Sequence, residues 1–309
     1  VDIISGTVAG VATSIVLDNI DTTGVTASAT KFSLNAGNIT GSAAVQSLSV
    51  SSTTAGATAT VGTFATATKM ATLSITATNA TAAVSHLGGT AAAAKLASIT
   101  LEANEANATL GNLDFTTAVA AGVTNTITMS STSGDTASIG TITGSATLNT
   151  LALNLSGAGT ITTGLINTFD LTVNAEETSG AVTVDGTTVA SAAVVNLGSG
   201  TNIYTVGLGN DVVTLKAGEG TDVVNMNIVA TAGDVYTINN FQVGASGDVF
   251  KISEDAFDAI GDLTGGAGIA ITGATGGVVQ LMTAASLTVA SGTNVIVLSD
   301  QNYATIALA

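Results

Sequence analysis

The feature that most constrains the fold is a short strand-like run that recurs along the first half of the chain. Each run alternates polar and apolar residues with a period of two, which is typical of a β-strand that buries one face. The first apolar residues of successive runs lie 25, 26, 28, 24 and 20 positions apart. The runs are Ser47–Val50, Thr72–Ile75, Ser98–Leu101, Thr126–Met129, Thr150–Leu153 and Asp170–Val173. A repeat of about 20–30 residues that contains two or more strands predicts one coil of a β-solenoid.

A second motif, apolar-Gly-x-apolar, lies between these runs and supplies a further strand to the repeat. It occurs at Val61–Phe64, Leu110–Leu113 and Ile139–Ile142. The alternative architecture is a string of β-sandwich domains, which also show frequent turn signals. The solenoid is favoured because the chain lacks the buried Trp and Tyr anchors of sandwiches and runs without a visible linker into a glycine-rich stretch near residue 198.

The composition agrees with a stacked fold. Cysteine, proline and tryptophan are absent and aromatic residues make up 3% of the chain, so a compact core of large side chains cannot be built. Stacked coils bury many small side chains instead, because each coil covers its neighbour. Disorder is excluded by the 46% hydrophobic content and the mean hydropathy of +0.56. Charged residues make up only 8%, so we expect an outer surface of Thr, Ser, Asn and Gly.

Three glycine-rich turns in tandem mark the region after residue 197. They are Gly198–Asn202, Gly207–Asp211 and Gly218–Asp222, and each is followed by a run rich in β-branched residues. Glycine permits positive φ and a tight backbone path, so carbonyl and carboxylate oxygens can converge. Oxygen ligands held in a turn suit Ca²⁺, which takes about six to eight of them. Solvated acids in ordinary Gly/Asn/Asp β-turns are the structural alternative.

This stretch resembles the nonapeptide repeat Gly-Gly-x-Gly-x-Asp-x-hydrophobic-x of RTX proteins, which forms a Ca²⁺-binding parallel β-helix. Some positions depart from that pattern. Leu197, Val206 and Ala217 replace the first glycine of the pair, Asn202 replaces one acid, and the second and third turns lie eleven residues apart. The segment 232–252 that follows is similar to the cap after RTX arrays in proteins exported by type I secretion.

The resemblance implies at least two Ca²⁺ ions, because a two-sided roll places alternate turns on the same edge. We therefore expect the first and third turns to stack, and the second to stack on the turn at Gly233-Asp234. Expected ligands of the first ion are Asn202, Asp222 and the carbonyls of Gly198, Gly200, Gly218 and Gly220. Expected ligands of the second are Asp211, Asp234, Gly207 and Gly209. Asp248, at the end of the cap, is a further candidate ligand.

Charge excludes one class of partner. Five lysines, no arginine and 21 acids give a formal net charge of −16, so the phosphate backbone of a nucleic acid would be repelled. Bound divalent cations would offset the mutual repulsion of the acids.

No run of about 18 apolar residues predicts a membrane span, and no signal peptide is recognised. The single His86, in a chain without cysteine, gives no basis for a catalytic centre, so we expect no enzyme.

Three segments follow from these patterns. Residues 1–190 are expected to form an irregular β-solenoid, and residues 191–252 an RTX-like Ca²⁺-binding β-roll with its cap. Residues 253–309 are expected to form a short helix at Ser253–Gly261, strands at 278–281, 287–289 and 294–298 that make a terminal β-hairpin, and a possible secretion signal. The fold class predicted is all-β, a right-handed parallel β-helix that continues into the roll. Because the chain begins at Val1, we expect it to be part of a longer protein.

As a whole, the chain resembles the C-terminal portion of bacterial surface-layer proteins exported by type I secretion. The resemblance implies a structural function, in which Ca²⁺ folds the chain after export and copies assemble into a two-dimensional lattice on the cell surface. It also implies attachment to cell-surface polysaccharide through a region outside this chain. Two alternatives stay open: an RTX adhesin or biofilm-matrix module, and the non-catalytic C-terminal tail of a secreted hydrolase.

Overall fold

The computed structural model describes the central part of the chain in full and some outer strands by their backbone only. The fully described residues are 47–53, 55–56, 58–64, 71–87, 97–114, 124–144, 150–167, 170–217, 219–226, 236–242 and 247–251. The backbone is also described at 2–3, 15–16, 24–29, 34–35, 39–40, 149, 169, 235, 252, 268–272, 278–283 and 294–298. The helix predicted at Ser253–Gly261 lies outside these residues, and no helix occurs within them.

Two long sheets make up the described structure. Sheet A has the order β1 (Asp2–Ile3), β3 (Gly24–Ala29), β6 (Ser47–Ser52), β8 (Thr72–Thr78), β10 (Ser98–Asn104), β12 (Thr124–Ser131), β15 (Asn149–Gly157), β17 (Phe169–Thr178), β19 (Val194–Asn196), β21 (Val212–Thr214), β23 (Val235–Asn239), β25 (Gly268–Thr272), β26 (Val278–Thr283) and β27 (Asn294–Leu298). Sheet B has the order β2 (Ile15–Val16), β5 (Ile39–Thr40), β7 (Ala59–Phe64), β9 (Ala82–Leu87), β11 (Ala108–Asp114), β13 (Thr136–Ile139), β16 (Thr160–Asn167), β18 (Val182–Thr188), β20 (Ile203–Thr205), β22 (Val223–Met226) and β24 (Val249–Ile252), with β4 (Leu34–Asn35) and β14 (Ile142–Thr143) beside that path.

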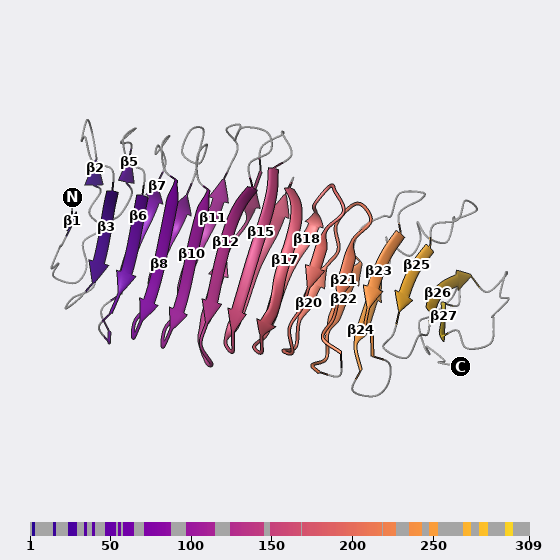
Figure 1. Ribbon diagram of the computed structural model, residues 1–309. Helices are drawn as coiled ribbons and strands as arrows, with labels where there is room; N and C mark the ends of the chain where they lie inside the picture. Colours follow the sequence, from indigo (N-terminus) through magenta and orange to yellow (C-terminus); the bar gives the residue numbers. More distant parts are fainter. Residues whose placement is uncertain are drawn as a thin grey trace.

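From β6 to β25 the chain alternates between the sheets, and strands in successive coils pair in parallel. Thus β8 in sheet A is followed by β9 in sheet B, and β8 itself pairs with β6 and β10. Figure 1 shows the strands standing in a row from one end of the molecule to the other. The protein is therefore an all-β parallel β-solenoid. A string of sandwich domains is excluded, because their sheets are antiparallel.

The C-terminal strands differ in one respect from the expected hairpin. Strands were predicted at 278–281, 287–289 and 294–298; β26 and β27 correspond to the first and third, whereas 287–289 lies outside the described residues. β26 and β27 pair in parallel, so they do not form a hairpin with each other. The antiparallel pair is β25 with β26. The segment between β26 and β27 is longer than a hairpin turn needs, which removes the constraint to antiparallel pairing.

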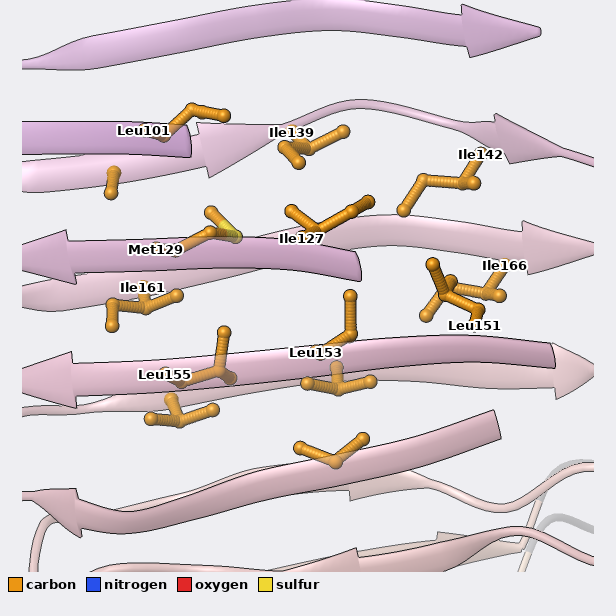
Figure 2. Close-up of a cluster of buried hydrophobic side chains, with 14 of the residues drawn as sticks. Leu101, Ile127, Met129, Ile139, Ile142, Leu151, Leu153, Leu155, Ile161 and Ile166 are labelled. Carbon is orange, nitrogen blue, oxygen red and sulfur yellow. The ribbon is translucent and has the colours of Figure 1, made fainter. Parts of the chain in front are cut away.

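The core consists of apolar side chains stacked in register along the solenoid. Leu48, Leu73, Ile99 and Ile127 are paired from coil to coil in sheet A, and each is at most 1% exposed. Figure 2 shows the same arrangement further along, where side chains from the two sheets meet between them. Full burial of such a side chain contributes about 1.5–3 kcal/mol. The core is thus long and thin. The expectation that it lacks buried tyrosine anchors is wrong, because Tyr204 and Tyr236, together with Phe64, are fully buried in it.

One repeat is offset from the spacing expected from the sequence. The predicted runs align Ile127 with Leu151, 24 residues on, but the structure pairs Ile127 with Leu153. Leu151 and Leu153 both point into the core and are fully buried. Because side chains on a strand alternate with a period of two, a slip by two residues keeps every inward residue inward. The pattern alone therefore does not distinguish the two registers.

The outer face of sheet A carries a continuous column of small polar residues. In register from coil to coil, the column comprises Ser49, Ser74, Thr100, Thr128, Asn154, Asn174, Asn196, Thr214 and Asn239. Within it, Nδ2 of Asn174 donates a hydrogen bond to Oδ1 of Asn154 at 2.9 Å. This polar column agrees with the Thr, Ser and Asn surface expected from the low charge content.

A column of glycines lines the edge where the chain passes from sheet A to sheet B. It comprises Gly159, Gly180, Gly200 and Gly220. A Cβ on Gly180, Gly200 or Gly220 would overlap the carbonyl oxygen of the preceding glycine in the column. Successive turns therefore pack backbone against backbone. This edge also holds two of the turns that were predicted to bind a metal ion.

Candidate metal centre

The first and third glycine-rich turns lie on the same edge in consecutive coils. Ile203 pairs with Val223 in sheet B, so the turns that precede these residues are stacked. The backbone N–H of Asn202 donates a hydrogen bond to Oδ1 of Asp222 at 3.0 Å. The expected stacking of these two turns is confirmed, and it brings Asn202 and Asp222 together inside the edge. Both side chains are 0% exposed.

Asn202, Asp222 and Asp248 form a ladder of equivalent side chains, here called the Asx ladder. Each immediately precedes a strand of sheet B at an in-register position. Oδ1 of Asn202 accepts a hydrogen bond from the N–H of Val182 at 3.2 Å. Oδ1 of Asp222 and Oδ1 of Asp248 accept equivalent bonds from the N–H groups of Asn202 and Asp222, at 3.0 and 2.9 Å. One side-chain oxygen per coil thus ties each turn to the coil before it.

The side-chain amide of Asn202 contacts oxygens that were expected to surround the first ion. Its Nδ2 donates to the carbonyls of Gly198 and Gly200, at 3.0 and 2.9 Å. The same nitrogen donates to Oδ1 of Asp222 at 2.9 Å. Three oxygens of the expected ligand set therefore converge, and an amide nitrogen lies within hydrogen-bonding distance of all of them.

Asp222 has one carboxylate oxygen that accepts no hydrogen bond. Oδ1 is engaged by Asn202, whereas Oδ2 is buried and has no partner. Burial raises the pKa of Asp222 from 3.8 to about 6; the hydrogen bonds from Asn202 oppose this rise, and the charge of Asp248 adds to it. A buried carboxylate oxygen without a donor is costly unless a proton or a cation meets it.

Asp248 closes the described ladder and is held from two sides. Its Oδ1 accepts from the N–H of Asp222, and its Oδ2 accepts from the N–H of Gln242 at 2.8 Å. Two carboxylates therefore occupy successive rungs. Gln242 was not among the residues expected at the site, because its contribution is a backbone N–H group that no side-chain pattern reveals.

Asp211, at the opposite edge, points into the core. Its Oδ1 accepts from the N–H of Ala193 at 2.8 Å. Its Oδ2 accepts from the N–H of Gly207 at 2.9 Å and from the Tyr204 hydroxyl at 3.0 Å. Burial raises the pKa of Tyr204 well above its usual value, and the adjacent charge of Asp211 adds to the effect. Three donors thus satisfy this fully buried carboxylate.

The expected partners of Asp211 are only partly described. Asp234, an expected ligand of the second ion, lies outside the described residues. So does Gly218, whose carbonyl was expected at the first ion. The structure pairs Val212 with Thr237, so Asp234 precedes the in-register partner by three residues whereas Asp211 precedes Val212 by one. Tyr236 donates from its hydroxyl to the carbonyl of Gly207 at 3.2 Å. This buried cluster was not predicted from the sequence. The signal that could have found it is the inward position of Tyr204 and Tyr236 in their alternating runs.

The expected glycines serve two different purposes. Gly209 and Gly220 adopt positive φ, at 112° and 77°. Gly200 and Gly207 do not show positive φ, and a Cβ on either would meet backbone of the preceding coil. Close approach alone therefore explains Gly200 and Gly207. At Gly209 and Gly220 the sequence argument for conformational freedom holds, and an added Cβ would also crowd the backbone of the preceding coil.

The chemistry of the Asx ladder fits a hard divalent cation. Its available atoms are carboxylate and carbonyl oxygens, which Ca²⁺ prefers. Across the described residues, no group of three or more His, Cys, Asp or Glu side chains gathers at one place, so backbone carbonyls would have to complete a coordination sphere. The unpartnered Oδ2 of Asp222 is the atom that a cation would satisfy.

Comparisons of the chain with family models, with curated proteins and with solved structures found no match.

In the part of the chain that the structure describes, no helix is long and apolar enough to cross a membrane. His86 pairs in register with Thr63 and Asn112, so its neighbours across the sheet offer a hydroxyl and an amide.

Proposed function

We propose that this chain is a structural β-solenoid of a bacterial surface layer, locked by Ca²⁺ after export through type I secretion. In this proposal the solenoid is a right-handed β-helix, and its C-terminal coils form an RTX-like β-roll with a β cap. Copies of the chain assemble into a two-dimensional lattice outside the cell. The role is structural and involves no catalysis.

The observation that supports the proposal is the unpartnered Oδ2 of Asp222 inside the Asx ladder. Asp222 and Asp248, with carbonyls of the turn that precedes Asp222, would hold the cation. Without it, a buried carboxylate opposes closure of these coils. A cation that binds the folded chain and not the unfolded chain contributes its binding free energy to folding. Export in the unfolded state and folding in Ca²⁺-rich surroundings follow from this linkage.

The charge and the outer faces support assembly. A formal net charge of −16 would make copies repel one another, and divalent cations offset such repulsion. The outer column of sheet A, from Ser49 to Asn239, carries uncharged hydrogen-bonding groups at the spacing of adjacent strands. A neighbouring copy can therefore contact the column itself without burying charge, whereas the acids Glu102 and Asp170 lie outward on the same face and would need divalent cations beside them.

The test compares two melting curves of the full chain, one in Ca²⁺ and one in EGTA, with unfolding monitored by circular dichroism. A free Ca²⁺ concentration about a hundredfold above the dissociation constant stabilises the folded chain by about 2.7 kcal/mol, so the melting temperature should rise by several degrees. Mg²⁺ at the same concentration is the control, since it demands a stricter geometry. Identical curves in Ca²⁺ and EGTA would contradict the proposal.

A binding module is the second candidate function, an adhesin or matrix protein that recognises a polysaccharide. The Ser, Thr and Asn column on sheet A favours it, because a straight row of hydroxyl and amide groups can hydrogen-bond to a repeating polymer. Negative-stain images of the Ca²⁺-loaded chain separate the two functions. Ordered arrays support the lattice, whereas isolated rods that bind an immobilised polysaccharide support the binding module.

A further inference from the structure

The three rungs of the Asx ladder are equivalent in one atom and different in the other. In Asn202, Asp222 and Asp248, Oδ1 accepts a hydrogen bond from the backbone N–H one coil earlier. Because Oδ1 is held in the same way and Ile203 pairs in register with Val223, we take Oδ2 of Asp222 to correspond to Nδ2 of Asn202. In Asn202 that atom is a nitrogen with two hydrogens, whereas in the two aspartates, when ionised, it is an oxygen with no hydrogen.

These second atoms are satisfied in different ways. Nδ2 of Asn202 donates to two carbonyls of its own turn, those of Gly198 and Gly200, and to Oδ1 of Asp222 in the next coil. The corresponding Oδ2 of Asp222 has no partner. A positively polarised group is thus present among the oxygens of one coil and missing at the equivalent place one coil later.

We propose that the side-chain amide of Asn202 is a built-in substitute for a bound cation in its own coil. The amide holds together the oxygens that a metal ion would otherwise draw together. The coil of Asn202 closes without Ca²⁺, and the cation is required only from Asp222 onward. This inference rests on the cation site of the proposed function, and it identifies the residue that sets where that site begins.

The proposal has a physical reason in the order of folding. The two N–H hydrogens of the Asn202 amide are shared among three acceptors of the chain itself. The coil of Asn202 therefore contributes these hydrogen bonds at any Ca²⁺ concentration. Its backbone N–H and side-chain amide are then in place to donate hydrogen bonds to Oδ1 of Asp222 in the next coil before a cation arrives. Replacing the amide by a carboxylate would place a buried oxygen against three other oxygens, which is unfavourable unless a cation binds.

The first experiment compares wild type with Asn202→Asp by calorimetric titration with Ca²⁺ and by melting in EGTA. We expect Asn202→Asp to bind one more ion per chain than wild type. In EGTA its melting temperature should fall by roughly 5–10 °C, and saturating Ca²⁺ should restore it. Asn196→Asp is the matched control, because it adds the same charge on the outer column of sheet A. It should leave the ion count unchanged.

A second variant covers the case in which Asn202→Asp fails to fold. Asp222→Asn places an amide where the unpartnered oxygen lies, so it should melt in EGTA at or above the temperature of wild type and lose its response to Ca²⁺ at this rung. A lower melting temperature for Asp222→Asn in EGTA would overturn the proposal, as would an unchanged ion count for a folded Asn202→Asp.

The outcomes separate this inference from the proposed function. If wild type binds no Ca²⁺ but Asn202→Asp gains one ion, the amide substitutes for a cation although the native chain uses none. If wild type binds Ca²⁺ and Asn202→Asp gains no ion, the proposed function stands, and the inference that the Asn202 amide replaces a cation is wrong.

Discussion

The hydroxyl of Tyr204 donates a hydrogen bond to Oδ2 of Asp211, 3.0 Å away, and this bond joins β20 of sheet B to the turn that opens β21 of sheet A. Both side chains are 0% exposed. Elsewhere in the described core the two sheets meet mainly through apolar side chains. At this coil a buried polar bond connects them, which fixes their relative position more narrowly than apolar contact does.

Substitution of Asp211 by alanine should destabilise the chain strongly. It removes the acceptor for the N–H groups of Ala193 and Gly207 and for the Tyr204 hydroxyl. Unsatisfied buried donors cost about 1–3 kcal/mol each, so we expect a loss of about 3–5 kcal/mol in the free energy of unfolding, measured by denaturant titration. Tyr204→Phe removes one of the three bonds and should cost less. A smaller loss for Asp211→Ala than for Tyr204→Phe would refute this account.

Alanine at Gly180 should disrupt the packing of successive turns. Its Cβ would overlap the carbonyl oxygen of Gly159, so backbone would have to move. We expect a loss of more than about 2 kcal/mol in the free energy of unfolding. Gly134 is the control, because it has positive φ but nothing within 4 Å of an added Cβ. Gly134→Ala should cost about 1 kcal/mol from backbone strain alone. Equal losses would show that crowding at Gly180 is unimportant.

Stability in EGTA should depend on pH through Asp222. Its pKa is raised from 3.8 to about 6 in the folded chain, chiefly by burial. Between these values the folded chain binds more protons than the unfolded chain, so the free energy of unfolding falls as pH rises from about 4 to about 6. Denaturant titrations across that range measure it. Asp222→Asn should flatten this part of the profile, and a profile identical to wild type would assign the dependence to another group.

The core should be sensitive to inward positions and tolerant at the adjacent outward ones. Leu153 is 0% exposed and lies between Ile127 and Val173 in register. Leu153→Ala should cost about 2–5 kcal/mol by removing buried methyl groups and leaving a cavity. Asn154→Ala, on the outer face, loses a hydrogen bond with Asn174 and should cost about 0.5–1 kcal/mol. Similar losses at the two positions would contradict the assigned faces.

Much of the fold could be predicted from the sequence because strand alternation is a local property. The runs that contain Leu48, Leu73 and Ile99 appear as strands of one sheet, in the predicted register. The slip at Leu151 and Leu153 could not be predicted, because both residues are inward and the pattern repeats every two positions. The two registers differ in which residue of β15 pairs with Ile127, and tertiary packing decides this.

The candidate site could be predicted as a location but not as a set of contacts. Stacking of the turns at Asn202 and Asp222 followed from their position on one edge of a two-sided roll. The interior role of Asp211 did not, because its donors come from Ala193 and Tyr204 in other coils. The contribution of Asn202 depends on which atom of its amide faces the turn, and hydrogen-bond geometry rather than residue type determines that.

The column from Gly159 to Gly220 packs main chain against main chain along one edge of the molecule. No substitution there can be absorbed by a change of rotamer, since the obstacle to any side chain is a peptide group. Mutational drift must therefore accumulate on the remaining surfaces and in the connections at the far margin. Over long divergence, descendants of this sequence should keep that seam of glycines after most of the side chains around it have been exchanged.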